Sequence, residues 1–252
     1  MTTVAAHYDR LLAEHYTWML GGDIEAIAAR ERPLLQELGV AGVARRGAVA
    51  IDLGCGSGAQ TLALADLGFQ TVVAIDQSRA LLDELAAHAA RRPSITIVCD
   101  DLVRALTKVD APVQAIVCMR DTILCLADRA AVVGLIERAA EALAAGGVLA
   151  LSYRDLSEPL EGLDRFLPVR SDADRIMLCA LDYGPETVTT TDLVYVRGAD
   201  GWQLHKSSYP KLRIEPDWLA EALAGAGLTV TVHQRSPGGM WLTAATGGGT
   251  LT

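Results

Sequence analysis

The sequence has 252 residues, of which 51% are hydrophobic and 21% are charged, and its formal net charge is -9. This length permits one large domain or one domain with a modest insertion, so we expect one hydrophobic core. An acidic chain without a cluster of lysine and arginine is poorly suited to a phosphate backbone, and we expect no nucleic-acid partner.

The first residues lack a basic stretch followed by an apolar one, and no uncharged apolar run reaches the roughly 18 residues that span a bilayer. We therefore expect a cytoplasmic protein with no membrane partner. The five cysteines form no CxxC pair and have no matching histidine spacing. The sequence thus predicts neither a disulfide framework nor a metal site.

From about residue 48, short β-branched runs alternate with longer stretches rich in alanine and leucine. This pattern is typical of a parallel sheet with helices between its strands, and the fold class is α/β. The expected strands span residues 48–53, 71–75, 95–98, 115–119 and 148–153. The expected helices span residues 59–67, 79–91 and 129–144, and Gly146 and Gly147 end the last of them.

The segments on either side of this core follow other patterns. Residues 7–39 predict two helices broken at Gly21 and Gly22, with Asp23 as the N-cap of the second, and we expect them to form a lid. An antiparallel insertion is predicted from strands over residues 175–182, 187–197 and 202–212. A helix from 216 to about 226 and strands over 229–234 and 240–245 predict a closing hairpin.

We therefore expect a single domain over residues 1–252. Its predicted parts are a helical lid (1–44), a binding core (45–154), an antiparallel insertion (155–213) and a C-terminal helix and hairpin (214–246).

A glycine-rich turn ends the first core strand and begins a helix. Its glycines, at Gly54 and Gly56 among others, let a ligand approach the backbone N–H groups of a helix start. Asp76 closes the next strand about twenty residues later, where a carboxylate can accept both hydroxyls of a ribose, although it can equally cap the helix after Ser78. Ala59 satisfies the dinucleotide spacing, so NAD stays open, while Asp52 suits a cationic amino-acid ligand better than a pyrophosphate.

Residues 51–58, Ile-Asp-Leu-Gly-Cys-Gly-Ser-Gly, closely resemble motif I of the class I methyltransferases that use S-adenosylmethionine (SAM). The likeness continues through residues 74–77 and 98–102 and covers roughly residues 45–153. It implies a Rossmann-like seven-stranded mixed sheet, SAM as cofactor and S-adenosylhomocysteine (SAH) as product.

The resemblance also implies a set of cofactor residues. They are Asp52, Gly54 and Gly56 near the methionyl part, Asp76 and Gln77 at the ribose, Asp101 and Leu102 at the adenine, and Met119 beneath it. Asp100 competes with Asp101 for the adenine, and one of the two equally well caps the next helix.

A narrower resemblance is to glycine N-methyltransferase and related small-molecule N-methyltransferases. It rests on residues 116–123, 149–156 and 206–210. In that family an asparagine stands at the position of Asp121, a histidine at that of Cys125, and an arginine that binds the substrate carboxylate at that of Arg154. The two departures disfavour glycine itself as acceptor, and the third stretch implies a role for Tyr209.

Residues at the carboxyl ends of the fourth and fifth strands face the ligand crevice of an open α/β sheet, which selects Arg120, Asp121 and Arg154 for the acceptor side. A salt bridge to Asp155 or to another loop acid explains Arg154 almost as well.

Aromatic residues in the expected lid are further candidates: Tyr8, His15, Tyr16 and Trp18. We predict that Tyr16 lies at the reacting groups and Trp18 at the cofactor, since aromatic faces suit a sulfonium. Burial in an amphipathic helix explains both equally well. His205, Cys118 and Cys125 are better explained by packing or surface exposure than by catalysis.

The sequence thus predicts methyl transfer from SAM to a nitrogen of a small-molecule acceptor by in-line displacement. The alternatives are an O-methyltransferase acting on a phenol, hydroxyl or carboxylate, an NAD-dependent oxidoreductase, and a SAM-binding regulator without catalysis. A homo-oligomer is compatible with the sequence.

Overall fold

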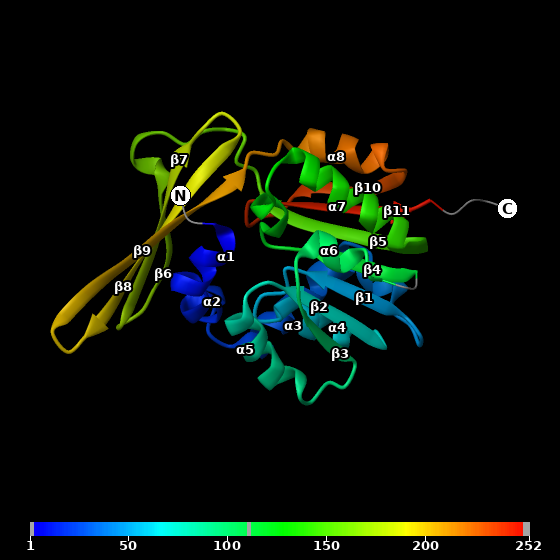
Figure 1. The fold of residues 1–252 in the computed structure, drawn as a ribbon, viewed down its shortest axis with the longest axis horizontal. Helices are drawn as coiled ribbons and strands as arrows, with labels where there is room; N and C mark the ends of the chain where they lie inside the picture. The colour runs from blue at the N-terminus through cyan, green and yellow to red at the C-terminus, as the bar shows by residue number, and fades with distance from the viewer. Residues whose placement is uncertain (1–2, 110–111, 249–252) are drawn as a thin grey trace.

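The computed structural model describes residues 3–109 and 112–248. The two ends of the domain predicted over residues 1–252 therefore lie outside the described residues. Figure 1 shows a sheet with helices on both faces and, beside it, a long antiparallel ribbon that packs against the N-terminal helices.

The main sheet has seven strands in the order β10-β11-β5-β4-β1-β2-β3. Its strands are β1 (Val49–Leu53), β2 (Thr71–Asp76), β3 (Ile95–Cys99), β4 (Val113–Cys118), β5 (Leu143–Arg154), β10 (Leu228–Arg235) and β11 (Met240–Gly247). Strands β1 to β5 pair in parallel, while β11 runs antiparallel to β5 and β10. The predicted Rossmann-like seven-stranded mixed sheet with a terminal hairpin is confirmed.

The two faces of this sheet are covered by different helices. One face packs against α6 (Leu102–Leu106), α7 (Arg129–Ala142) and α8 (Pro216–Gly225), and the other against α3 (Ile24–Glu37), α4 (Ala59–Asp66) and α5 (Arg79–Ala89). Alternation along the strands produces this division: Ile51 and Leu53 of β1 enter the first core, whereas Ala50 enters the second.

The insertion forms a separate antiparallel sheet in the order β6-β7-β8-β9. These strands are β6 (Phe166–Ser171), β7 (Arg175–Tyr183), β8 (Thr187–Gly198) and β9 (Gly201–Leu212). The last three were predicted. Strand β6 was not, because it is an edge strand with mostly exposed or half-exposed side chains and a proline at residue 168.

The N-terminal segment consists of α1 (Val4–His7), a π-helical segment η1 (Tyr8–Leu12) and α2 (Ala13–Leu20). Asp23 caps α3 by accepting hydrogen bonds from the backbone N–H groups of Glu25 and Ala26, as predicted. Leu11 and Leu12 pack with Trp18 against Met177 and Val194 of the second sheet.

One predicted boundary is wrong. Helix α7 ends at Ala142, and Gly146 and Gly147 lie inside β5, not at the helix terminus. Leu143 already pairs with Val113 of β4, and the register shifts between Val113 and Ala115. A Cβ on Gly147 would lie 3.0 Å from the Val113 carbonyl oxygen. Glycine is therefore required at this position by the irregular strand pairing and not by a helix cap.

Candidate functional site

The glycine turn follows β1 in a left-handed backbone conformation. The φ angle is +71° at Gly54 and +54° at Gly56, and a Cβ on Gly54 would lie 2.3 Å from a carbon of Thr122. The Gly56 N–H donates to the Asp76 carboxylate at 2.9 Å, and the Ser78 N–H donates to its other oxygen at 2.8 Å. The turn and the end of β2 are therefore fixed to each other.

A cavity of about 440 Å³ opens at this turn, and we call it the glycine-turn cavity. Six of the predicted cofactor residues line it: Gly54, Gly56, Asp76, Gln77, Asp101 and Leu102. Burial raises the pKa of the Asp76 carboxyl above its usual range. The three strand ends thus bring a glycine turn, two carboxylates and an apolar side chain to one space.

The neighbouring acids Asp100 and Asp101 have different surroundings. Asp101 lines the glycine-turn cavity and also caps α6, where it accepts from the N–H groups of Val103 and Arg104. Asp100 instead forms ion pairs with Arg104 and Lys108 and lines neither cavity described here. Asp101 is therefore the one placed to meet a ligand.

Two predicted cofactor residues lie behind the glycine-turn cavity. Asp52 is buried and accepts a hydrogen bond from the Thr61 hydroxyl at 2.6 Å, and burial raises its pKa to about 7. Met119 is also buried, and neither residue lines a cavity described here. This geometry does not support the prediction that Asp52 and Met119 lie beside a ligand.

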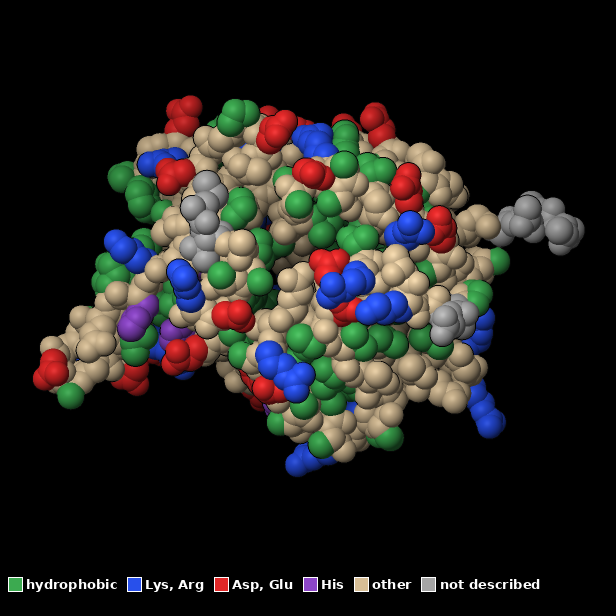
Figure 2. All heavy atoms as spheres, viewed as in Figure 1, with side chains coloured by type: hydrophobic (Ala, Val, Ile, Leu, Met, Phe, Trp, Pro, Cys, Tyr) green, Lys and Arg blue, Asp and Glu red, His purple; other side chains and the backbone are tan. Residues whose placement is uncertain are grey.

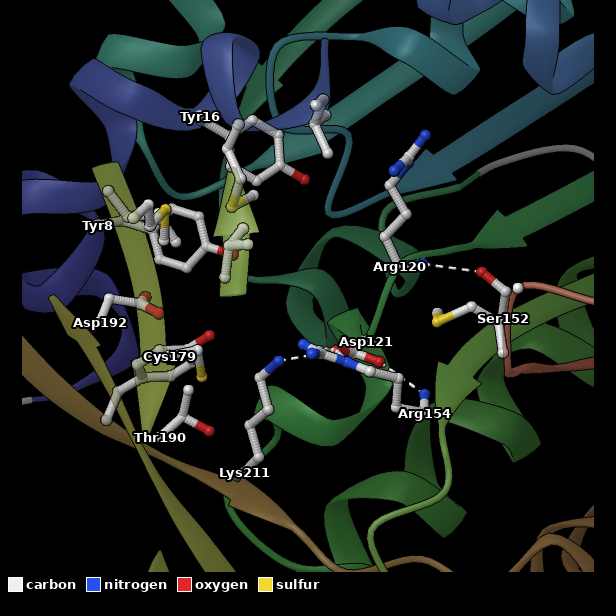
Figure 3. Close-up of a pocket in the computed structure, with 18 of the residues that line it drawn as sticks. Tyr8, Tyr16, Arg120, Asp121, Ser152, Arg154, Cys179, Thr190, Asp192 and Lys211 are labelled. Atoms are coloured by element: carbon white, nitrogen blue, oxygen red, sulfur yellow. Dashed lines mark hydrogen bonds and ion pairs between the residues drawn. The ribbon is translucent and has the colours of Figure 1, made fainter. Parts of the chain in front are cut away.

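A second cavity, of about 620 Å³, lies between the main sheet and the second sheet, and we call it the Arg154 cavity. The charged residues labelled in Figure 3 come from β5, the loop after β4, and strands β8 and β9, and Glu31 of α3 also lines the cavity. The acceptor candidates Arg120, Asp121, Arg154, Tyr16 and Tyr209 all line it.

Asp121 is the centre of a charged cluster in this cavity. Its carboxylate accepts from Lys211 Nζ at 2.7 Å and from Arg154 Nε at 2.7 Å. Burial alone would raise the pKa of Asp121, but these two cations outweigh it and hold the pKa below its usual range. Arg154 therefore pairs with Asp121 and not with Asp155.

The backbone before this cluster is left-handed. Arg120 and Asp121 have φ angles of 58° and 69°, which are unusual for residues with a side chain. Ser152 of β5 holds the turn, since its hydroxyl accepts from the Arg120 N–H at 2.9 Å and its carbonyl from the Asp121 N–H at 3.1 Å. Arg120 also forms an ion pair with Glu31 of α3. The strained turn directs both side chains into the Arg154 cavity.

Tyr8 and Tyr16 line both cavities and so form a shared wall. Their ring centroids are 6.0 Å apart, and burial raises the pKa of both phenols, which stay neutral. Figure 3 shows both rings directed from the N-terminal helices into the Arg154 cavity. The expected lid therefore contributes to the site through these two residues.

Strand β9 also borders both cavities. Tyr209 and Lys211 line the Arg154 cavity, whereas Pro210 and Leu212 line the glycine-turn cavity. Successive side chains of a strand point to opposite faces, so one strand serves both spaces.

The predicted cofactor contact of Trp18 is not supported by its position. Its indole N–H donates to Asp172 at 2.5 Å, and the guanidinium groups of Arg170 and Arg175 lie 5.3 and 4.6 Å from its ring. It lines neither cavity described here. The structure agrees with the alternative explanation, in which Trp18 is buried by the packing of an amphipathic helix.

Asp192 and His7 were not selected from the sequence. Asp192 lines the Arg154 cavity from β8, and its carboxylate lies 2.9 Å from Nε2 of buried His7. A signal was available, because the inward positions of β8 hold Val188, Thr190, Asp192 and Val194, and an acid in that series has no packing explanation.

The remaining candidates are two cysteines and two histidines, and they do not form a reactive group. Burial raises the pKa of the Cys118 thiol and, to about 11, that of Cys125. His15 is buried in the N-terminal helices, and His205 is exposed on β9. Packing and exposure account for Cys118 and His205, whereas Cys125 lines the glycine-turn cavity and the lid candidate His15 lines neither cavity.

The surface charges of both signs are mixed on the visible face. On the face seen in Figure 2, lysine and arginine side chains are interspersed with aspartate and glutamate. This face offers no continuous basic surface to a nucleic-acid backbone. Within residues 3–109 and 112–248, no helix is long and apolar enough to cross a membrane.

A family described as a methyltransferase domain matches residues 50–147, and no curated protein matches the chain. The chain is similar in structure to the CcbJ methyltransferase from Streptomyces caelestis, with 19% identity, a TM-score of 0.76, and 96% of this chain and 98% of that one covered. It is similar to KedS8, a sugar N-methyltransferase from a Streptoalloteichus species, with 18% identity, a TM-score of 0.71 and coverage of 99% and 96%.

A third similar structure is SAM-bound CalS10, an amino pentose methyltransferase from Micromonospora echinaspora, with 20% identity, a TM-score of 0.69 and coverage of 93% and 96%. Such identities establish the fold. Residues 50–147 of this chain are therefore similar to a methyltransferase domain, and the chain has the fold of these methyltransferase structures.

Proposed function

We propose that this protein transfers a methyl group from SAM to a nitrogen atom of a small molecule. One observation carries the proposal: a cavity at the glycine turn and a second, charged cavity meet at a shared wall made by Tyr8 and Tyr16. Methyl transfer needs this arrangement, since donor and acceptor must approach each other in line from two separate sites.

The residues of the glycine-turn cavity fit SAM. Gly54 and Gly56 line this cavity with backbone alone, and their left-handed conformations and the contacts with Thr122 and Tyr16 leave no room for a side chain. Asp76 would accept the ribose hydroxyls, while Asp101 and Leu102 would border the adenine. The cavity volume of about 440 Å³ lies in the range of small-molecule sites.

Bound SAM supplies a methyl group on a positively charged sulfur, which is already activated for displacement. The protein then has to orient the acceptor, exclude water and present the acceptor atom with a free electron pair. Tyr8 and Tyr16 would border the reacting groups where the two cavities meet, and Arg154 and Lys211 carry N–H groups that can bind oxygen atoms of the acceptor.

A nitrogen acceptor suits the Arg154 cavity better than a phenol or hydroxyl. Among the described acids that line this cavity, Asp121 and Glu31 are paired with lysine or arginine, whereas Asp192 has His7 as its partner and can bind an amine. An amine needs only to arrive unprotonated. Three similar structures, CalS10, KedS8 and the glycopeptide N-methyltransferase MtfA, carry names that describe an amino sugar or N-methylation.

The sequence resemblance to glycine N-methyltransferase implies that Arg154 binds a substrate carboxylate, and Arg154 lines the Arg154 cavity. Its guanidinium is occupied by Asp121, and a cavity of about 620 Å³ exceeds the needs of glycine. We therefore expect a larger amine than glycine as the acceptor.

Calorimetry of the purified chain with SAM, SAH and NAD tests the proposal. We expect micromolar binding of SAM and SAH and none of NAD. Asp76→Ala should weaken SAH binding at least about 100-fold, since it removes a charged acceptor of two hydrogen bonds. Asp83→Ala, an exposed acid on α5, is the matched control and should change nothing.

Catalysis is tested by incubating the protein with SAM and a set of amines and phenols and measuring SAH and methylated product by mass spectrometry. A methylated amine supports the proposal, and a methylated phenol would move the acceptor atom to oxygen. SAH binding without product from any acceptor would favour the regulator, and preference for NAD would exclude SAM chemistry.

A further inference from the structure

Asp192 differs from the other acids of the Arg154 cavity in its partners. Glu31 is paired with Arg120, and Asp121 with Lys211 and Arg154. Asp192 is paired with His7, and among the described residues no lysine or arginine forms an ion pair with it. It is thus the one acid of this cavity wall without a permanent cation as partner.

His7 is placed to hold this carboxylate in position. The ring is buried, stacks on Tyr209 with centroids 4.2 Å apart, and has its Nε2 atom 2.9 Å from Asp192. Its Nδ1 atom is buried and has no hydrogen-bond partner among the described residues. Nε2 is therefore the ring nitrogen that can donate to the carboxylate and fix its position.

The surroundings of Asp192 suit an ammonium or amine. Thr190, two residues earlier on β8, faces the same cavity with a buried hydroxyl oxygen that has no partner among the described residues. Tyr8 and Tyr209 stand beside it, with ring centroids 6.4 Å apart, and both phenols contribute to the cavity wall. A carboxylate, a free hydroxyl and aromatic faces together are the groups that bind a cationic nitrogen.

The position of Asp192 also matches the route of transfer. Tyr8 belongs to the wall shared with the glycine-turn cavity, and Figure 3 places Asp192 next to Tyr8 and away from Arg154. A nitrogen held at Asp192 would therefore lie on the donor side of the Arg154 cavity.

From these contacts we infer that Asp192, positioned by His7, binds the methyl acceptor's amino group as its ammonium form and takes one proton from it, which frees the nitrogen's electron pair for the methyl group, with Thr190 as a second contact. This inference rests on the proposed function and adds to it the residue that recognises the amine.

Sinefungin provides a probe that does not require the natural acceptor. In this analogue of SAM a carbon bearing an ammonium group replaces the methylated sulfur, so its positive nitrogen points toward the acceptor. SAH carries no such group. The ratio of the two affinities, measured by calorimetry, therefore reports the attraction of the acceptor cavity for a cationic nitrogen.

In Asp192→Asn we expect sinefungin to bind roughly tenfold more weakly while SAH binding changes less than about twofold. Asp192→Glu keeps the charge and should restore most of the preference for sinefungin. Asp182→Asn, which removes an exposed acid from the same sheet, should leave both affinities unchanged. Retained SAH binding shows that each variant is folded.

Equal losses for both ligands in Asp192→Asn, or no loss for either, would overturn the inference. The inference would also be overturned if Asp192→Glu lost the preference for sinefungin over SAH to the same extent as Asp192→Asn. Failure of the unmodified protein to bind SAH is a separate result, which overturns the proposed function and the inference with it.

Discussion

Asp121 and Arg154 are joined twice, since the backbone N–H and the Nε group of Arg154 each donate to a different oxygen of the Asp121 carboxylate at 2.7 Å. The link connects the left-handed turn after β4 to the end of β5, and Lys211 adds a bond from the second sheet. Asp121 is thus where the two sheets and the Arg154 cavity are tied together.

Asp121→Asn should lower the free energy of unfolding by about 3–5 kcal/mol, because it leaves Lys211 buried beside Arg154 without a counter-charge. Urea denaturation at pH 7 measures the change. In the double variant Asp121→Asn with Lys211→Met, much of the loss should be recovered. If the double variant loses as much unfolding free energy as the two single variants lose together, the charges do not interact in this way.

Arg154→Ala should raise the KM for the amine identified by mass spectrometry and lower kcat/KM about tenfold or more, while SAH affinity stays within about twofold. The reason is that Arg154 lines the Arg154 cavity and not the glycine-turn cavity. Steady-state kinetics and calorimetry separate the two effects, with Arg154→Lys as the conservative control. An equal loss of SAH affinity would assign Arg154 to the donor side.

Asp52→Asn should change how stability depends on pH. Burial raises the pKa of Asp52 to about 7, so between its usual value and 7 the folded state keeps a proton that the unfolded state has lost. That contribution to stability is complete at acid pH and is lost as the pH rises through 7. From pH 5 to pH 8, Asp52→Asn should therefore gain roughly 2.5 kcal/mol of unfolding free energy relative to the unmodified protein in urea denaturation.

The comparison at two pH values cancels the titration of every other group that both proteins share. A difference between the two proteins that stays constant from pH 5 to pH 8 would contradict the raised pKa.

Gly54→Ala and Gly39→Ala form a matched pair. Both glycines are left-handed, with φ of +71° and +79°, but a Cβ on Gly39 meets nothing within 4 Å, whereas on Gly54 it collides with Thr122. Backbone strain should lower the unfolding free energy of each variant by about 1 kcal/mol. The collision should lower that of Gly54→Ala further and weaken its SAH binding. Thr122→Ala added to Gly54→Ala should recover part of the loss, and equal behaviour of the two single variants would contradict the collision.

Trp18→Phe removes the hydrogen bond to Asp172 and should lower the unfolding free energy by about 1–2 kcal/mol. Because Trp18 lines neither cavity, SAH affinity should stay unchanged. Trp202→Phe, a half-exposed tryptophan near Arg197, is the control and should cost less than about 0.5 kcal/mol. Weakened SAH binding in Trp18→Phe would return this residue to the cofactor site.

The core and the glycine turn could be predicted because their information is local. Alternating residues such as Ala50 and Ile51 set the two faces of β1, and the turn requires glycine at fixed positions. The boundary at Leu143 could not be predicted in this way, since pairing with Val113 ends the helix and nothing in the alanine-rich run itself marks it.

The acceptor side depended on contacts between distant parts of the chain. Lys211 is 90 residues from Asp121, and His7 is 185 residues from Asp192. The sequence located Asp121 and Arg154 at strand ends, but the partners that determine their charge come from the insertion. For the same reason Trp18, an aromatic residue near a predicted pocket, could not be distinguished from one that anchors the N-terminal helices.

The alternation of β9 between the two cavities constrains how this protein can vary. A single-residue insertion or deletion in that strand would exchange the two sets of side chains, turning Lys211 toward the glycine turn and Leu212 toward Asp121. Length changes are instead tolerable at the far hairpin tip near Gly198 and Gly201, which pair with each other. New acceptor preferences can therefore arise by substitution at alternate positions of one strand, while the cofactor side stays the same.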